Sequence, residues 1–476
     1  MSTHVGWTSL KEEQGLKMSC DLWLNSMLKY NTDPHDWEKP SLTGQCGLFR
    51  SVVSKDPDKF IDLISQTVRD VRIQLSYPIS GMQGLLDAGR VDDAMHVLKE
   101  ILNVIYNDIN TTVRGFSLHT LLFALNDIPK KEHVPETAFE LFCNALINCK
   151  EPDEDRHQED KDVHNVGVNQ PRGNAGYMLV ECAHEKKYKE AIFSTIESIV
   201  GTASVYTRAA ILLNMAALNL LDKNRNVELF KRLMYDYNPR LMALPVHNYN
   251  PLVYFVNYAV DELMDFFSHA VDIPECYEEQ VVILWLAWSH NDRDDRIKAF
   301  LDKICDTSQE ARISLLNFLG TIEKDVNDDA IYYILHFMES QFDTPEMGEA
   351  FDNLFHHIDK WPDNIQLKIT EEYVYSPLSK HQIRTFIGYL GGYAIKNPVL
   401  TLKWLELILE ADIPDDFYIW NRIVDVVIQS YNGIKSFNDS SYQEILDHAM
   451  DLIDTIMQNP SNKNLISNFI NKLDNE

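Results

Sequence analysis

The chain has 476 residues, of which 45% are hydrophobic and 24% are charged, a composition typical of folded proteins and unlike that of disordered chains. Its 72 acidic and 43 basic residues give a net charge of −29, which repels nucleic acid and anionic membrane surfaces and argues against both as partners. Basic or mixed protein surfaces are the expected partners, although the charge can equally serve only to keep a long chain soluble.

The seven cysteines are scattered along the chain without a Cys-x-x-Cys pair, and most of them lie in apolar helical patterns. We therefore expect them to be reduced core residues of a cytosolic protein. The segment from Met1 to Ser9 is polar and lacks the apolar centre of a signal peptide. The longest apolar run, Val281 to Trp288, is too short to cross a membrane. These features together predict a soluble, cytoplasmic protein.

Residues 1–55 contain scattered aromatic and turn residues, and we expect them to form an irregular N-terminal cap. Helical patterning begins at Asp56-Pro57, where a side-chain acceptor precedes a proline suited to the first position of a helix. From Val91 to Ile105, apolar residues recur at the spacing of one face of an amphipathic helix. Residues 56–150 are therefore predicted to form an N-terminal array of helical repeats.

Residues 151–169 interrupt this pattern, with seven acidic residues up to Asp162 and no apolar residue before Val163. Such a segment cannot bury enough apolar surface to offset its ordering entropy, so we predict a solvated loop or linker that proteases cut first. An alternative remains open, because its histidines and aspartates could together hold a divalent metal; these are His157, His164, Asp153, Asp155, Asp160 and Asp162.

Residues 170–476 resume the helical pattern and are expected to form a second, longer array. Thr344-Pro345 and Asn397-Pro398 repeat the helix-start signal of Asp56-Pro57. The aromatic stretch from Tyr249 to Tyr258 is predicted to be packing core, with a binding surface as the alternative. Phe355-His356-His357-Ile358 is predicted to lie inside a helix, where adjacent side chains diverge and the two histidines cannot both face one metal ion. Although Asp352 and Asp359 are nearby, a surface face is therefore favoured over a metal site.

About twenty amphipathic segments joined by short polar loops, with no βαβ unit, predict an all-α fold. Many short helices in sequence are most easily packed as a right-handed α-solenoid of stacked antiparallel helix pairs, as in HEAT, armadillo and TPR proteins. Solenoids of this kind offer extended concave surfaces, which favours protein binding as the function.

A weak internal repeat places an arginine near the start of several apolar helices. Thr112-Val113-Arg114-Gly115 and Gln170-Pro171-Arg172-Gly173 share one plan, and Arg208 and Arg312 enter their helices in a similar way. An arginine there can bond exposed carbonyl groups of the preceding repeat and so tie neighbours together. The structural or recognition candidates are thus Arg114, Gly115, Asn169, Arg172, Gly173, Arg208 and Arg312.

No motif for catalysis is found in the sequence. It lacks the Gly-x-x-x-x-Gly-Lys-Ser/Thr loop that cradles phosphates, the Gly-x-Gly-x-x-Gly dinucleotide fingerprint, the Gly-x-Ser-x-Gly elbow and the His-Glu-x-x-His zinc motif. We therefore expect no enzymatic activity and no cofactor.

One stretch, Asn169-Gln170-Pro171-Arg172-Gly173-Asn174-Ala175, resembles the Asn-x-x-Arg-Gly-x-Ala box in the C-terminal helical repeats of bacterial antiviral STAND NTPases. Further landmarks over about residues 20–330 follow that family in collinear order: Asp56-Pro57-Asp58-Lys59-Phe60, Ile79 to Leu85, Val205 to Ala210, and Val227 to Leu233.

In that family an effector and an ATPase domain precede the repeats, which wrap a phage protein and trigger oligomerisation. The resemblance therefore implies a sensor module that binds a protein ligand, such as a phage protein, in antiviral defence. Motifs of the effector and the ATPase are missing here, so neither nucleotide hydrolysis nor cleavage is implied. A general cytoplasmic scaffold, or a separated part of a larger STAND NTPase, remains the alternative.

Overall fold

The computed structural model describes residues 8, 10–33, 40–107, 117–151, 162–245, 250–322, 326–409, 417–435 and 443–458. Within these ranges 77% of the residues are helical and none lies in a strand, so the predicted all-α fold is confirmed. None of the helices in these ranges is long and apolar enough to cross a membrane. The chain divides into two compact units, Met1–Glu262 and Leu263–Glu476.

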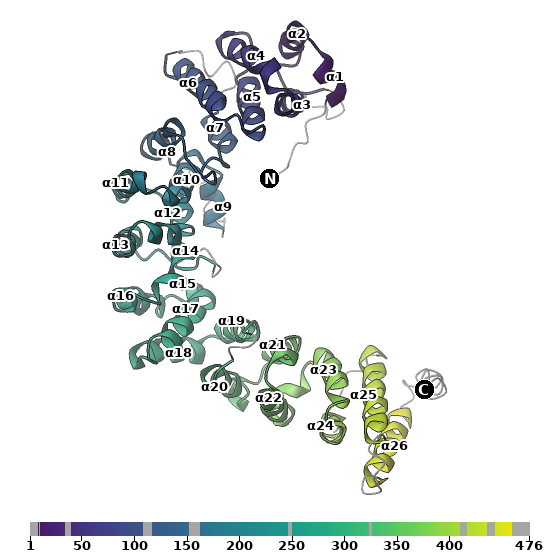
Figure 1. Cartoon of the computed structure of the whole chain (residues 1–476). Helices are drawn as coiled ribbons and strands as arrows, with labels where there is room; N and C mark the ends of the chain where they lie inside the picture. The colour runs from purple at the N-terminus through teal and green to yellow at the C-terminus, as the bar shows by residue number, and fades with distance from the viewer. Residues whose placement is uncertain are drawn as a thin grey trace. The chain divides into compact units, whose positions relative to one another are not determined.

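In its described ranges, the first unit is built from short α-helices and three 3-10 turns (Figure 1). They are α1 (Glu12–Lys17), α2 (Cys20–Lys29), α3 (Leu42–Lys55), α4 (Pro57–Arg69), α5 (Ser76–Asp87), α6 (Val91–Asn107), α7 (Leu118–Ala124), α8 (Glu136–Asn148), α9 (Val163–Val168), α10 (Pro171–Glu181), η3 (Cys182–His184), η4 (Lys186–Tyr188), α11 (Lys189–Ile199), α12 (Val205–Leu212), η5 (Met215–Leu220), α13 (Lys223–Leu233), α14 (Pro239–Met242) and α15 (Pro251–Phe255). Helix α16 (Val260–Ala270) spans the division between the units.

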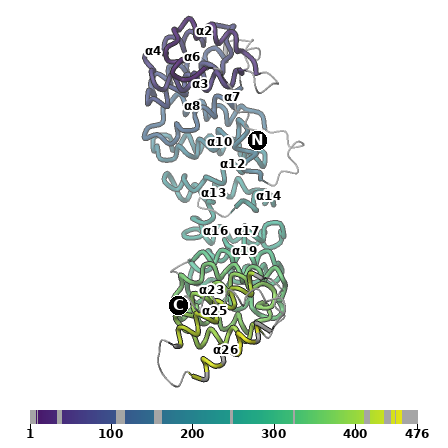
Figure 2. The backbone as a smooth tube through the Cα atoms, turned by 90° about the vertical axis from the view of Figure 1, so that its right-hand side faces the viewer, coloured from purple at the N-terminus to yellow at the C-terminus, as the bar shows by residue number. Residues whose placement is uncertain are grey.

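Helices of the first unit pack against their next-but-one neighbours as well as their immediate ones. One series runs through α2, α4, α6 and α8, and a second runs through α3, α5, α7, α10, α12 and α14. Figure 2 shows the backbone passing from α8 through α10 and α12 to α13. The apolar face predicted from Val91 to Ile105 lies within α6, where Ala94, Leu98 and Ile101 are fully buried.

The second unit has the same kind of packing. Its elements are η6 (Pro274–Cys276), α17 (Tyr277–His290), α18 (Asp295–Thr307), α19 (Gln309–Gly320), α20 (Asp328–His336), η7 (Ser340–Phe342), α21 (Pro345–Leu354), η8 (Ile358–Lys360), α22 (Asp363–Tyr375), η9 (Pro377–Lys380), α23 (Arg384–Ala394), α24 (Pro398–Leu409), α25 (Phe417–Lys435) and α26 (Gln443–Gln458). Two rows of helices are visible in Figure 1: α17, α19, α21, α23 and α25 contact in series, and so do α20, α22, α24 and α26.

Side-chain caps fix many of the helix starts. The hydroxyl of Thr344 accepts a hydrogen bond from the backbone amide of Met347 at 3.2 Å, as its place before Pro345 predicts. Asp56 also stands before a proline, but its side chain makes no capping bond to α4. A helix start can therefore rest on the proline alone, whose missing N–H needs no partner there.

The boundaries expected from the sequence differ from this division. The described parts of residues 1–55 contain three helices rather than an irregular segment. The division falls at Glu262 and not at 151–169, and α8 and α10 on either side of that segment pack together. Most of the acidic segment, residues 152–161, lies outside the described residues, and its predicted mobility stays a prediction. None of the seven cysteines forms a disulfide, and four are buried: Cys46, Cys182, Cys276 and Cys305.

Candidate functional site

Arg172, near the start of α10, is 6% exposed and links the ends of neighbouring helices. Its Nε donates to the carbonyl oxygen of Leu146 near the end of α8 at 2.8 Å, and its Nη1 pairs with the carboxylate of Glu151. That carboxylate also accepts hydrogen bonds from Ser204 (2.6 Å) and Thr207 (2.8 Å) around the start of α12. One guanidinium and one carboxylate therefore join α8, α10 and α12.

Gly173 and Asn169 serve the packing of the same region. A Cβ atom on Gly173 would lie 2.3 Å from the carbonyl oxygen of Gly167 in α9, so only glycine fits this approach. Asn169 caps the end of α9, and its amide donates to the carbonyl and side-chain oxygens of Asn165 at 2.7 and 2.8 Å. The box that resembles the STAND repeats therefore has a packing role in this chain.

Arg208 and Arg312 also bond the carbonyl groups at helix ends. Arg208 donates to the carbonyl oxygen of Leu233 at 2.8 Å, which belongs to the following helix α13 rather than to a preceding one. Arg312 donates to the carbonyl oxygen of Cys305 in the preceding α18, and its guanidinium lies 4.3 Å from the ring centre of Phe342.

These arginines present little surface to a ligand, because Arg208 is 3% exposed and Arg312 is 7% exposed. We therefore interpret Arg172, Arg208 and Arg312 as residues that hold helices together. Arg114 and Gly115, the remaining candidates from the sequence, lie outside the described residues.

The structure corrects the predicted position of His356 and His357 inside a helix. Helix α21 ends at Leu354, so His356 and His357 lie in the turn before η8 instead of inside a helix. Asp352 is fully buried rather than on a surface face, because its carboxylate accepts hydrogen bonds from the backbone amides of Thr385 (3.0 Å) and Phe386 (2.9 Å) in the first turn of α23. This carboxylate holds α23 against α21.

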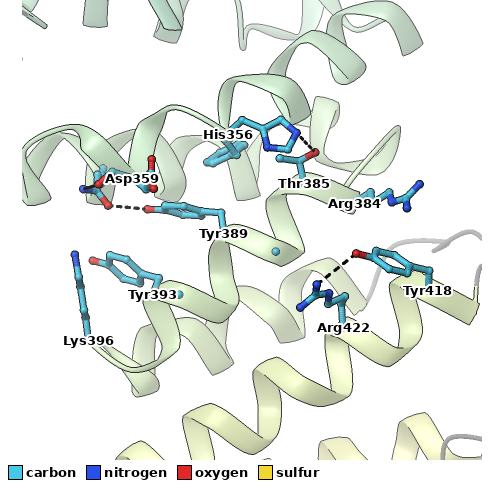
Figure 3. Close-up of a pocket in the computed structure, with 13 residues that line it drawn as sticks. His356, Asp359, Arg384, Thr385, Tyr389, Tyr393, Lys396, Tyr418 and Arg422 are labelled. Carbon is cyan, nitrogen blue, oxygen red and sulfur yellow. Dashed lines mark hydrogen bonds between the residues drawn. The ribbon is translucent and has the colours of Figure 1, made fainter. Parts of the chain in front are cut away.

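A cavity of about 910 Å³ runs along α23 (Figure 3). Its walls come from the turn after α21, from α22, from α23 itself and from α25. The lining residues are Phe355, His356, Asp359, Gln366, Arg384, Thr385, Gly388, Tyr389, Gly392, Tyr393, Lys396, Tyr418 and Arg422. We call this cavity the α23 groove.

Positive charge and an exposed tyrosine gather at one end of the α23 groove (Figure 3). The guanidinium of Arg384 lies 4.3 Å from the ring centre of Tyr418, and that of Arg422 lies 5.6 Å from it. Arg422 also donates to the Tyr418 hydroxyl at 3.4 Å. This hydrogen bond, with the charges of Arg422 and Arg384, lowers the pKa of Tyr418 below its ordinary value.

The opposite end of the α23 groove is tyrosine-rich and of mixed charge. Lys396 forms an ion pair with Asp363 at 3.3 Å, and the exposed Asp359 lies near Tyr389 at the same end in Figure 3. Burial raises the pKa of Tyr389 and that of Tyr393, so both hydroxyls stay neutral at physiological pH. This end therefore offers neutral aromatic rings and a carboxylate.

Between the two ends, the floor of the groove is formed by Gly388 and Gly392 of α23, which have no side chains. A Cβ atom added to Gly388 or to Gly392 would meet no other atom within 4 Å, so the space above this face of α23 is open. The groove can therefore admit a chain or ring directly against the helix backbone.

Groups that could do chemistry are few in the groove. The His356 imidazole Nε2 lies 3.3 Å from the Thr385 hydroxyl, a spacing that suits a base and a nucleophile. However, no hydrogen bond from another described residue orients that imidazole, as a catalytic triad would require. Among the described residues, no three His, Cys, Asp or Glu side chains are placed to hold a metal; His157 and most of the acidic loop lie outside them.

Comparisons of this chain with protein-family models, with curated proteins and with solved structures found no match. The function is therefore inferred from the geometry of the α23 groove and of the helix packing.

Proposed function

We propose that the chain is a non-enzymatic recognition module that binds a protein ligand. We further propose that its helices form a right-handed α-solenoid of stacked antiparallel pairs, of the HEAT, armadillo or TPR type. The two contact series in each unit support this architecture, because solenoid repeats contact mainly their neighbours along the stack. Stacks of this kind offer long surfaces suited to macromolecules.

The observation that carries the proposal is the composition of the α23 groove. Arginine and tyrosine are the residues that most often anchor protein interfaces, and the groove presents Arg384, Arg422 and the 43% exposed Tyr418 together. Its open floor gives access to an extended partner. The structural arginines Arg172 and Arg208 contribute by holding the helices in place.

The resemblance of the Asn169–Ala175 box to STAND repeats makes a phage protein the first ligand to test, in a role in antiviral defence. A general scaffold or adaptor is the second candidate function, and a separated part of a larger STAND NTPase is a third description of the same module. An ATPase or nuclease encoded by a neighbouring gene would favour the defence role over the scaffold.

Hydrogen exchange of the full chain, with and without purified candidate phage proteins, tests the proposal. We expect a genuine ligand to protect amides along several consecutive helices, including α23 and α25, because a protein surface covers several repeats. We also expect no saturable ATP binding, since the sequence holds no phosphate-cradling loop. Tight nucleotide binding, or protection confined to one small cleft, would contradict the proposed recognition module and favour an enzyme.

A further inference from the structure

We propose that the α23 groove binds an extended, acidic segment of the protein partner, with one carboxylate held between Arg384 and Arg422. This inference rests on the proposed function and specifies the chemistry of the partner. Helix α23 has 11 residues and is therefore about 16 Å long, a length that about five residues of extended peptide would cover.

Arg384 and Arg422 make no ion pair within the part of the chain that the structure describes, although the charge of Asp425 also acts on Arg422. Both guanidinium groups lie against the same tyrosine ring. In this acidic chain most described arginines do form such pairs, namely Arg50, Arg69, Arg72, Arg90, Arg172, Arg208, Arg225, Arg293 and Arg296. A carboxylate from outside would neutralise two neighbouring positive charges and accept charge-assisted hydrogen bonds.

The glycines on the groove floor also indicate that a ligand lies against α23. Glycine inside a helix costs about 0.5–1 kcal/mol relative to alanine. No contact within the chain requires it at Gly388 or Gly392, since a methyl group would fit in open space at both positions. A ligand backbone lying directly on α23 would account for two glycines that the packing of the chain leaves unexplained.

The distribution of charge along the groove favours a peptide over a polyanion such as nucleic acid. The carboxylate of Asp359 lines the end of the groove away from the arginines, Asp363 pairs with Lys396 at that end, and the whole chain carries a charge of −29. A strand with a phosphate on every residue would be repelled there, whereas a peptide can place its acid at one end only. The rings of Tyr389 and Tyr393 at the same end as Asp359 suit apolar side chains of such a peptide.

The experiment uses the full chain and two pools of labelled octapeptides, alike except that the fourth residue is glutamate in one pool and glutamine in the other. Fluorescence anisotropy should show the glutamate pool binding about tenfold more tightly, with the difference shrinking as salt is added. Arg384→Gln and Arg422→Gln should each remove most of that preference. Arg296→Gln, which removes an equal charge from an exposed ion pair in the same unit, should leave it unchanged.

A second pair of variants tests the floor of the groove. Gly388→Leu should abolish binding of both pools by filling the open space, whereas Gly47→Leu, at another open and exposed helical glycine, should not affect it. Both are checked by circular dichroism for retained helix.

The inference fails if the two pools bind equally, or if Arg384→Gln and Arg422→Gln keep the preference for glutamate. In either case a protein ligand that still protects consecutive helices in hydrogen exchange would leave the proposed function standing. If instead neither a protein nor the glutamate pool binds, both proposals fail together. Equal loss of binding in the Arg296→Gln control would show a general charge effect and would also overturn the inference.

Discussion

The Cα atom of Gly173 lies against the carbonyl group of Gly167, and a Cβ atom at that position would be 2.3 Å from the carbonyl oxygen. The obstructing atom belongs to the backbone, so no side-chain rotation can relieve the clash. We expect Gly173→Ala to lower the free energy of unfolding by about 1–3 kcal/mol through overpacking between α9 and α10. Urea denaturation followed by circular dichroism measures this change.

Gly47→Ala is the matched control, because Gly47 lies in helix α3 where an added Cβ meets no atom within 4 Å. It should raise the stability by up to about 1 kcal/mol through helix propensity alone. An unfolding midpoint of Gly173→Ala as high as that of the unmodified chain would contradict the close approach of α9 and α10.

Arg172 is expected to stabilise the first unit through its bonds to Leu146 and Glu151. Arg172→Ala should lower the free energy of unfolding by about 1–3 kcal/mol, because it leaves the buried carbonyl of Leu146 without this donor and the partly buried carboxylate of Glu151 without its positive partner. Arg232→Ala serves as control, since the exposed Arg232 makes only a 3.3 Å bond to the carbonyl of Glu197. Equal melting temperatures for the Arg172 variant and the unmodified chain would assign Arg172 to ligand contact instead.

The pair formed by Arg208 and Asp236 predicts a pH-dependent stability. Both terminal nitrogens of Arg208 donate to the Asp236 carboxylate, at 2.8 and 2.7 Å, and this holds the pKa of Asp236 below its ordinary value of 3.8. A depressed pKa means that the stabilisation is complete above pH 3.8 and is lost as the pH falls through the folded-state pKa.

Asp236→Asn should therefore destabilise the chain by about 1–3 kcal/mol at neutral pH. The difference between this variant and the unmodified chain should begin to shrink as the pH falls below 3.8, and it should be smallest below the folded-state pKa of Asp236, where both side chains are neutral. Urea titrations across that range provide the measurement. A difference that stays constant with pH would mean that Asp236 acts through packing and not through its charge.

Local periodicity predicted the helices well, but it was wrong after Leu354, where the apolar spacing continues although the helix ends in a turn. The apolar spacing of Val91 to Ile105 marks α6, which extends over Val91–Asn107. Phe351, Phe355 and Ile358 keep the same helical spacing, yet α21 ends at Leu354. The buried bonds of Asp352 to the amides of α23 are long-range contacts, which a local pattern does not contain.

The α23 groove could not be predicted because its parts come from separate helices. Arg384 and Arg422 come together only when α23 packs against α25. The available signal was the set of glycines at Gly388, Gly391 and Gly392, which is unusual within an 11-residue helix. By contrast, the positions of Arg172, Arg208 and Arg312 near helix starts were predicted, because the residues that begin a helix form a local pattern.

Tyr418 gives an optical measurement of the α23 groove. Its pKa is lowered from an ordinary value of 10.0 by the hydrogen bond from Arg422 and by the positive charges of Arg422 and Arg384, which favour the phenolate. Burial raises the pKa of other tyrosines, among them Tyr77 and Tyr333. The difference in phenolate absorbance between the unmodified chain and Tyr418→Phe should therefore show one group titrating below pH 10.0.

The same titration reports on the bound carboxylate. Arg422→Gln should move the pKa of Tyr418 back toward 10.0, because it removes both the donor and a positive charge. Adding the glutamate peptides at saturation should also raise it, since a carboxylate near the arginines opposes the second negative charge. The glutamine peptides carry no charge at this residue and should leave the pKa of Tyr418 unchanged. A Tyr418 titration that neither Arg422→Gln nor the glutamate peptides alter would show that its ring does not share the field of the two arginines.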